Sequence, residues 1–530
     1  MNMLIDINCA KCIGIDAVPV TVEVDITPGI GIHLVGMADI AVKESLLRTI
    51  TALQSLGYHI PGKKIVINLA PADMHKSGGG YDVPIALGII TASGQVELPG
   101  LRKYLIMGEL GLDGSVREVS GALPFADLAR ERGLEGCILP LESALEVTEC
   151  DELSVFAVQS LSDVLRILQE EEDCSDLLIW NTERYRTLVA GEADSPSGTG
   201  AGGVDFSEII GQEGAKRGAE IACAGGHNLI MVGPPGSGKS SLAKAMAGIL
   251  PPMTTDEAIV TSKIYSVAGL KRNGLGLIRQ RPFRSPHYSA SLPAIIGGGA
   301  GADIRPGEVT LAQNGILFLD EYGQMPRSVL EALRGPMEDR CVTISRLRSK
   351  LEFPASFMLV AASNPCPCGY FGEGNRCSCT PGQRAGYLSR LSGPVMDRID
   401  IQIELPSLSY DELSDTDKST VRESSATVRE RVCAARDFAA RRMGEEDSRR
   451  FFCNAQLDAA AIRRYCTATD EATDLLRTAY NALGLSARGY DRVMRVARTI
   501  ADLDASAEIQ AQHIAEAIQL RSLDRKYWGA

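Results

Sequence analysis

The sequence is poor in aromatic residues and has no long hydrophobic run, and each absence excludes a class of protein. Aromatic residues make up 5% of the 530 residues, so aliphatic side chains must form most of the core. No uninterrupted apolar stretch approaches the roughly 20 residues that a membrane-spanning helix needs. The first residues also lack a basic region followed by an apolar one, which is the mark of a signal peptide. We therefore expect a cytoplasmic protein without a membrane segment.

An excess of positive charge is also missing. The net charge is −13, so the composition as a whole does not indicate nucleic-acid binding, although a basic groove can lie on an acidic protein. The 14 cysteines stand in a chain without an export signal, which indicates reduced thiols or metal ligands rather than disulfides. A chain of this length is expected to form two to four domains.

Changes in composition divide the chain into four segments. Residues 1–170 form the first predicted domain. Residues 171–204 follow as a linker, because residues 193–203 are small, polar and rich in glycine. Residues 205–406 alternate strand-like and helix-like patterns, which predicts an α/β domain with a parallel sheet. Residues 407–530 are predicted to be helical, with no proline between residues 459 and 523.

The strongest motif is a phosphate-binding loop between an apolar run and a helical pattern. Residues 229–232 are apolar, and residues 233–240 match G-x-x-x-x-G-K-S at every fixed position, which argues against a coincidental lysine in a glycine loop. Lys239 is expected to reach the β- and γ-phosphates of ATP, and Ser240 to bind Mg²⁺. The residues predicted to bind the nucleotide are Gly233, Pro234, Pro235, Gly236, Ser237, Gly238, Lys239, Ser240 and Ser241.

Two further apolar runs end in polar residues that suit ATP hydrolysis. Residues 315–319 lead into Asp320, which suits Mg²⁺ coordination, and Glu321, which suits activation of the attacking water. Residues 357–363 lead into Asn364, whose side chain is expected to hold that water near the γ-phosphate. An asparagine after a strand is also a common turn residue. The order of these strand ends predicts a Mg²⁺-dependent ATPase.

A cysteine cluster begins two residues after Asn364. The pattern is C-x-C-x₈-C-x-C, and four thiolates this close can form a tetrahedral zinc site. The alternative is four free thiols in a glycine-rich loop. The candidate zinc ligands are Cys366, Cys368, Cys377 and Cys379.

Two basic stretches are candidates for contact with nucleic acid. One covers residues 279–288 and ends in His287 and Tyr288; the other covers residues 340–350 and includes Arg346, Arg348 and Lys350. Lysine and arginine would pair with phosphates in a salt-dependent way, and an aromatic side chain could stack on a base. The alternative is a solvated surface with ordinary ion pairs.

The chain resembles the magnesium-chelatase-like AAA+ ATPases of the ComM/YifB type over nearly its whole length. The most specific stretches are residues 210–213, 305–312, 363–365 and 391–400. The resemblance implies an AAA+ P-loop core with a C-terminal helical lid. It also implies a homo-hexameric ring with each ATP site at a subunit interface. The two basic stretches lie where AAA+ cores of this family insert hairpins toward the central pore.

The same resemblance implies two arginines that act on phosphate. Arg398, in a D-R-I-D segment, would be the finger that reaches the γ-phosphate of a neighbouring subunit. The alternative is a structural salt bridge with Asp397 or Asp400. Arg488, in the segment S-A-R-G-Y, would be a second phosphate sensor.

The first domain resembles the proteolytic domain of Lon, a fold shared with domain 2 of ribosomal protein S5. The matching stretches are residues 65–80 and 136–140. Lon uses a serine–lysine dyad, and the resemblance places Gly80 and Pro124 where these two residues should stand. Because a serine nucleophile needs a base nearby, we expect a module for binding or assembly and no protease activity.

Together these features predict a cytoplasmic ATPase that moves on single-stranded or branched DNA. The resemblance to ComM, a DNA branch-migration motor of natural transformation, favours helicase or branch-migration activity. One alternative is a protein remodeller or chelatase-like motor with a protein client. Another is a nucleotide-gated regulator, against which Glu321 argues, since a pure switch does not need it.

Overall fold

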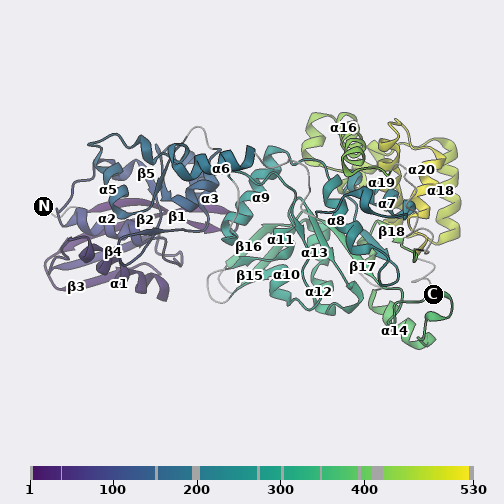
Figure 1. The fold of residues 1–530 in the computed structure, drawn as a ribbon, viewed down its shortest axis with the longest axis horizontal. Helices are drawn as coiled ribbons and strands as arrows, with labels where there is room; N and C mark the ends of the chain where they lie inside the picture. Colours follow the sequence, from purple (N-terminus) through teal and green to yellow (C-terminus); the bar gives the residue numbers. More distant parts are fainter. Residues whose placement is uncertain are drawn as a thin grey trace.

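The fold was obtained as a computed structural model and is elongated, with the N-terminal domain at one end and the C-terminal helices at the other (Figure 1). The structure describes residues 4–37, 39–149, 153–193, 203–270, 275–299, 304–346, 349–391, 395–408 and 422–523. None of the helices in these residues is long and apolar enough to cross a membrane.

The N-terminal domain is built on a mixed seven-stranded sheet with the order β3-β4-β2-β1-β5-β8-β9. Burial alternates along β4 (Lys64–Ala70), so one face of that strand points into the core. The other strands are β1 (Ile5–Ile13), β2 (Asp16–Thr27), β3 (Gly31–Val35), β5 (Tyr104–Ile106), β8 (Gly136–Pro140) and β9 (Ser154–Val158).

Beside the short helix α4 (Leu141–Ala144), four longer helices complete the described part of this domain. They are α1 (Ile40–Ser55), α2 (Asp82–Ala92), α3 (Ala122–Glu131) and α5 (Leu161–Gln169). Helix α2 is buried along almost its whole length, which is why its sequence is apolar on every side. Gly80 stands just before α2 and Pro124 lies inside α3. The likeness to Lon stays a prediction.

The segment between the two sheets is more ordered than the composition suggests. It contains the short 3₁₀ helices η3 (Ser175–Leu177) and η4 (Ile179–Asn181) and the helix α6 (Glu183–Ala193). Trp180, Tyr185 and Leu188 of this segment pack against the core of the N-terminal domain. Residues 194–202 of the glycine-rich run lie outside the described residues.

The second sheet has five parallel strands in the order β11-β14-β17-β10-β18. The three central strands are buried at every residue, as their unbroken apolar sequences predict for a sheet covered on both faces. The strands are β10 (Leu229–Val232), β11 (Phe283–Arg284), β14 (Ile316–Leu319), β17 (Met358–Ser363) and β18 (Ile401–Glu404). This confirms the α/β fold class.

Apolar cores lie on both faces of this sheet. Leu229 and Met231 of β10 join a core that includes α7 (Glu213–Gly225), α8 (Lys239–Ile249) and the C-terminal helices, whereas Ile230 and Val232 join the opposite one. The C-terminal helices are α16 (Ser425–Arg450), α17 (Ala459–Tyr465), α18 (Asp470–Leu483), α19 (Ala487–Leu503) and α20 (Ala511–Gln519). The helical segment therefore shares a core with the sheet.

Helix α9 (Thr255–Ala268) joins the two sheet domains (Figure 1). Lys263 Nζ lies 3.0 Å from a carboxylate oxygen of Asp16 and 2.8 Å from one of Asp127, both in the N-terminal domain. The Gly121 N–H donates to the carbonyl of Ser266 at 3.0 Å. The N-terminal domain is thus docked on the helix that follows the one capped by the phosphate-binding loop.

Candidate nucleotide-binding site

The phosphate-binding loop connects the end of β10 to the start of α8. Gly236 and Gly238 have φ angles of 81° and 89°, in the left-handed region that favours glycine, and Gly238 is the N-cap of α8. A Cβ on Gly233 would lie 2.3 Å from the carbonyl oxygen of Leu405, so a side chain has no room there. The free N–H groups at the start of α8 give this loop the form of an anion site.

Lys239 lies inside this loop and is almost fully buried. Its Nζ donates to the carbonyls of Gly233 and Pro234 at 2.7 Å each and lies 3.4 Å from Oδ1 of Asn364. Burial lowers the pKa of Lys239 to about 8, and the negative charge of Asp320 offsets part of that effect. The ammonium is therefore placed at the loop by the backbone carbonyls, where phosphate oxygens could replace them.

Two oxygen ligands for a divalent cation lie side by side. Ser240 Oγ donates to Oδ2 of Asp320 at 2.8 Å, and Oδ1 of Asp320 accepts from the Glu321 N–H at 2.9 Å. Hydroxyl and carboxylate oxygens are the ligands that Mg²⁺ prefers, so this pair fits the ion that the sequence predicts.

Glu321 has a left-handed backbone, with φ at 50°, and its side chain is exposed. Such a conformation is uncommon for a residue other than glycine and is often found at functional sites. The structure brings Lys239, Ser240, Asp320 and Asn364 together at the carboxyl edge of the sheet, with Glu321 beside them.

The lowered pKa of Lys239 predicts that ATP binds less tightly as the pH rises through about 8. Below this pH the ammonium is charged, whereas above it most molecules carry a neutral amine that must take up a proton when phosphate binds. We expect the Kd for ATP to rise about tenfold between about pH 7 and about pH 9. Equilibrium titration with a fluorescent ATP analogue at fixed ionic strength measures this.

The matched control for the pH experiment is Lys239→Arg. A guanidinium stays charged throughout this range, so the variant should show a nearly flat curve whatever its absolute affinity. A flat curve for the wild-type protein would contradict the assigned titration of Lys239.

The four predicted zinc ligands converge. Their Sγ atoms all lie within 4.8 Å of one another, with Cys366 Sγ 3.8 Å from Cys377 Sγ and Cys368 Sγ 3.7 Å from Cys377 Sγ. Thiolates around a tetrahedral Zn²⁺, at Zn–S distances of about 2.3 Å, are separated by similar lengths. The donor set and its geometry therefore fit zinc.

The cysteine loop touches the phosphate-binding loop. A Cβ on Gly369, inside the cluster, would lie 2.7 Å from Cδ of Pro235. The cluster also starts two residues after Asn364, so any change in its shape would reach both Asn364 and the phosphate-binding loop.

The two predicted phosphate-sensing arginines lie at the other edge of the sheet. Arg398 ends the 3₁₀ helix η8 (Met396–Arg398), just before β18 starts, and the Asn228 side chain donates to its carbonyl at 3.0 Å just before β10 starts. Since the strands are parallel, the length of β10, about 13 Å, separates this edge from the phosphate-binding loop. Arg398 and Arg488 therefore do not join the other site residues of the same chain.

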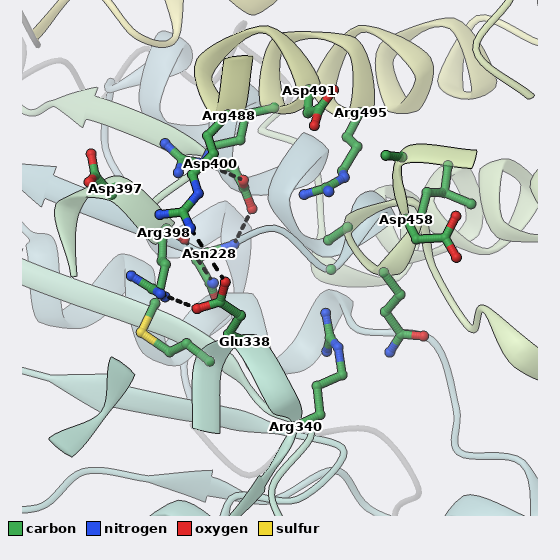
Figure 2. Close-up of a pocket in the computed structure, with 17 residues that line it drawn as sticks. Asn228, Glu338, Arg340, Asp397, Arg398, Asp400, Asp458, Arg488, Asp491 and Arg495 are labelled. Carbon is green, nitrogen blue, oxygen red and sulfur yellow. Dashed lines mark hydrogen bonds and ion pairs between the residues drawn. The ribbon is translucent and has the colours of Figure 1, made fainter. Parts of the chain in front are cut away.

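Arg398 and Arg488 line a pocket of about 420 Å³ together with Glu338 (Figure 2). Arg398 forms an ion pair with Glu338, and Nη2 of Arg488 lies 3.9 Å from Oε1 of the same carboxylate. The pocket walls come from α13 (Arg334–Asp339), residues 397–400, residues 455–459 and the start of α19.

The predicted alternative partners of Arg398 are corrected by this arrangement. The sequence offered Asp397 or Asp400, but the structure pairs Arg398 with Glu338. Asp400 is buried and lies 3.5 Å from Nδ1 of His227 and 3.9 Å from Nε of Arg492. Burial alone would raise the pKa of Asp400, but the nearby His227 and arginines hold it below its usual value.

Arginines of the first basic stretch form ion pairs with carboxylates of the same chain. Arg279 pairs with Glu149 at 2.5 Å, Arg281 with Glu257 at 2.8 Å and Arg284 with Glu308 at 2.6 Å. Because these carboxylates lie outside the stretch itself, the sequence of the stretch alone has the form of an unpaired basic patch. Arg281 and Arg284, whose side chains are mostly covered, are therefore already neutralised within the chain, and contact of this stretch with nucleic acid stays a prediction.

The second basic stretch forms a hairpin of β15 (Cys341–Arg346) and β16 (Ser349–Pro354). Lys350 is exposed on it. Arg348 and the side chain of Arg346 lie outside the described residues.

A parallel sheet with a phosphate-binding loop after one strand and acidic residues after another defines a P-loop NTPase. Matches to protein-family models narrow this class further. "Magnesium chelatase, subunit ChlI" matches residues 205–413, "Subunit ChlI of Mg-chelatase" matches residues 22–143, and "Magnesium chelatase, subunit ChlI C-terminal" matches residues 422–521.

Curated relatives cover almost the whole chain. YifB of Salmonella typhimurium is 41% identical over 98% of this chain and 97% of its own length. Competence protein ComM of Haemophilus influenzae is 42% identical over 97% of this chain and 96% of its own length. The chain belongs to the ComM/YifB family of magnesium-chelatase-like AAA+ ATPases, and this membership implies ATP hydrolysis with the use of a nucleotide and Mg²⁺.

A more distant relative matches part of the chain. The Holliday junction branch migration complex subunit RuvB of a Wolbachia strain is 28% identical over 36% of this chain and 52% of its own length.

Proposed function

We propose that this protein is a homo-hexameric motor that uses ATP hydrolysis to move DNA strands, as a helicase or branch-migration enzyme. The observation that carries the ring is the separation of Arg398 and Arg488 from the phosphate-binding loop of their own chain. An arginine that cannot reach its own nucleotide can serve the site of a neighbour. The relatives named for competence and for Holliday junction branch migration support DNA as the substrate.

In the proposed site each residue has one task. Lys239 would neutralise the β- and γ-phosphates, and Glu321 would take a proton from the attacking water, which Asn364 would orient. A Mg²⁺ ion held by Ser240 and Asp320 would supply charge neutralisation at the phosphate oxygens. Arg398 of the adjacent subunit would stabilise the charge that develops on the γ-phosphate.

The DNA contact is assigned to the hairpin β15–β16 and to the exposed side chains of His287 and Tyr288. Lys350 would pair with phosphates, and Tyr288, whose ring stacks near His287 with centroids 4.3 Å apart, would contact a base. Such contacts carry little sequence preference and weaken as salt rises.

ATP turnover with and without DNA tests the proposal. The purified protein is assayed at low salt alone, with single-stranded DNA and with branched DNA, and Glu321→Gln serves as the background control. We expect DNA to raise turnover several-fold and added salt to remove the increase. Turnover that is robust but indifferent to every DNA form would overturn the DNA assignment.

That second outcome would favour a motor with a protein client. The family models named for a magnesium chelatase subunit support this candidate. The N-terminal domain, docked on α9, would then hold the client.

We also propose that the four-cysteine cluster binds one zinc ion that shapes the loop beside Asn364 and Pro235. Zinc would supply structure there and take no part in hydrolysis. Elemental analysis should find about one zinc per chain, and Cys377→Ser should lose it.

Loss of zinc should also lower ATP turnover several-fold, because the loop touches the phosphate-binding loop. The matched control is Cys433→Ser, a partly buried thiol on α16 outside the cluster. Equal zinc content in the wild-type protein and Cys377→Ser would contradict the zinc site.

A further inference from the structure

One carboxylate, Glu338, holds both candidate phosphate-sensing arginines. Arg398 comes from the segment before β18 and Arg488 from the first turn of α19, yet both point toward Glu338 in the same pocket (Figure 2). The pKa of Glu338 lies below its usual value, chiefly because of its hydrogen bond with Arg398. The carboxylate therefore stays charged and neutralises the two arginines in the single chain.

Glu338 differs in its exposure from Asp400, the buried acid of the same pocket. Its side chain is 53% exposed, whereas that of Asp400 is 8% exposed and already lies between His227 and Arg492. A half-exposed carboxylate can leave its partners at little cost, because water replaces the lost contacts. A buried one cannot.

The place of Glu338 in the chain links the arginines to the hairpin. It lies on α13, and β15 starts three residues later at Cys341. The Arg340 guanidinium donates to Ser356 Oγ at 3.2 Å, and the Arg340 carbonyl accepts from the Ala355 N–H at 2.8 Å, so the junction is tied to the end of the hairpin. A movement of α13 would reach β15 and β16 directly.

We propose that Glu338 is a positioning residue that occupies Arg398 and Arg488 until the γ-phosphate of a neighbouring subunit displaces it. Displacement frees α13, so the hairpin β15–β16 shifts when ATP arrives at the interface. In the opposite direction, DNA bound to the hairpin moves Glu338 away from the arginines and speeds ATP hydrolysis in the site of the neighbouring subunit. This inference rests on the proposed ring and deepens it by naming the connection between the two sites.

The test is Glu338→Gln, which keeps the size of the side chain and removes its charge. Without the competing carboxylate the arginines should engage phosphate more readily, so kcat without DNA should rise about fivefold, the scale of an exposed ion pair. The ratio of DNA-stimulated to basal kcat should fall toward one. Two controls accompany it, Glu338→Asp, which keeps the charge, and Glu331→Gln, which removes a comparable exposed acid paired with Arg327.

A double-mutant cycle shows whether Glu338 acts through the arginine. In an Arg398→Ala background, Glu338→Gln should change kcat by less than about twofold. The proposal is overturned if Glu338→Gln leaves the basal kcat unchanged or lowers it, if Glu338→Asp raises it equally, or if the effect persists without Arg398.

The basal kcat also separates this proposal from the proposed function. If DNA does not change the kcat of the wild-type protein, the DNA assignment fails. The effect of Glu338→Gln on the basal kcat still decides the role of Glu338. If DNA stimulates both the wild-type protein and Glu338→Gln equally, the motor stands and the connection through Glu338 fails.

Discussion

Glu321→Gln should lower steady-state ATP turnover by about a hundredfold or more and leave ATP bound, because a positioned general base contributes about 10²–10⁴-fold to a reaction rate. Glu321 is the second residue after β14, is exposed, and has a left-handed backbone. The amide has nearly the same size but cannot accept the proton of the attacking water. The Ser240–Asp320 contact stays intact, so the phosphate-binding loop keeps its form.

Two measurements separate binding from chemistry in this experiment. Steady-state phosphate release gives turnover, and titration with a fluorescent ATP analogue gives the Kd. Lys239→Ala is the contrasting variant, since it should lose affinity as well as turnover. If Glu321→Gln kept more than about a tenth of the wild-type rate, another group would have to be the base.

The sequence predicted the fold class and the local form of the phosphate-binding loop well, and for a physical reason. A strand buried on both faces must be apolar throughout, so β10, β14 and β17 stand out as unbroken apolar runs. The residues that follow such strands meet at one sheet edge, which is why Lys239, Asp320 and Asn364 could be assigned to one site from the sequence alone.

The sequence did not predict which residue each charged side chain pairs with. Arg398 pairs with Glu338, sixty residues earlier in the chain, while two acids lie within two positions of it. The same limit made Arg281 and Arg284 resemble a nucleic-acid surface, although Glu257 and Glu308 neutralise them. These ion pairs join residues far apart in the chain and depend on tertiary packing, so local sequence carries no signal for them.

The linker shows a second limit. Residues 171–204 were predicted to be a linker because residues 193–203 are rich in glycine, yet Trp180 and Leu188 within this range pack on the N-terminal core. A few apolar anchors are enough to fix short helices when a neighbouring surface receives them, and that surface is not visible in the segment itself.

The second large effect concerns Arg398 and requires the ring. Arg398→Ala should lower turnover about a thousandfold, because an arginine supplied to a phosphoryl-transfer site contributes about 10³–10⁵-fold. Lys239→Ala should be equally inactive, since it lacks a functional phosphate-binding loop. Because Arg398 lies at the edge of the sheet opposite the phosphate-binding loop, the two defects fall in different ATP sites of a ring.

Mixing the two inactive proteins therefore should restore activity. Wherever an Arg398→Ala subunit presents its intact phosphate-binding loop to the arginine of a Lys239→Ala neighbour, one complete site forms. In an equimolar mixture that exchanges freely, about a quarter of the interfaces have this arrangement. Turnover after dissociation at high salt and reassembly measures the recovery, and an unmixed sample of each variant treated in the same way is the control.

The mixing result separates three roles for Arg398. Recovery means that the residue acts across the interface, because no single chain in the mixture holds both groups. An arginine that served its own site would give no recovery, since every chain with an intact phosphate-binding loop would lack it. A purely structural pair with Glu338 would give an Arg398→Ala protein that loses stability and not kcat, which thermal unfolding of each variant detects directly.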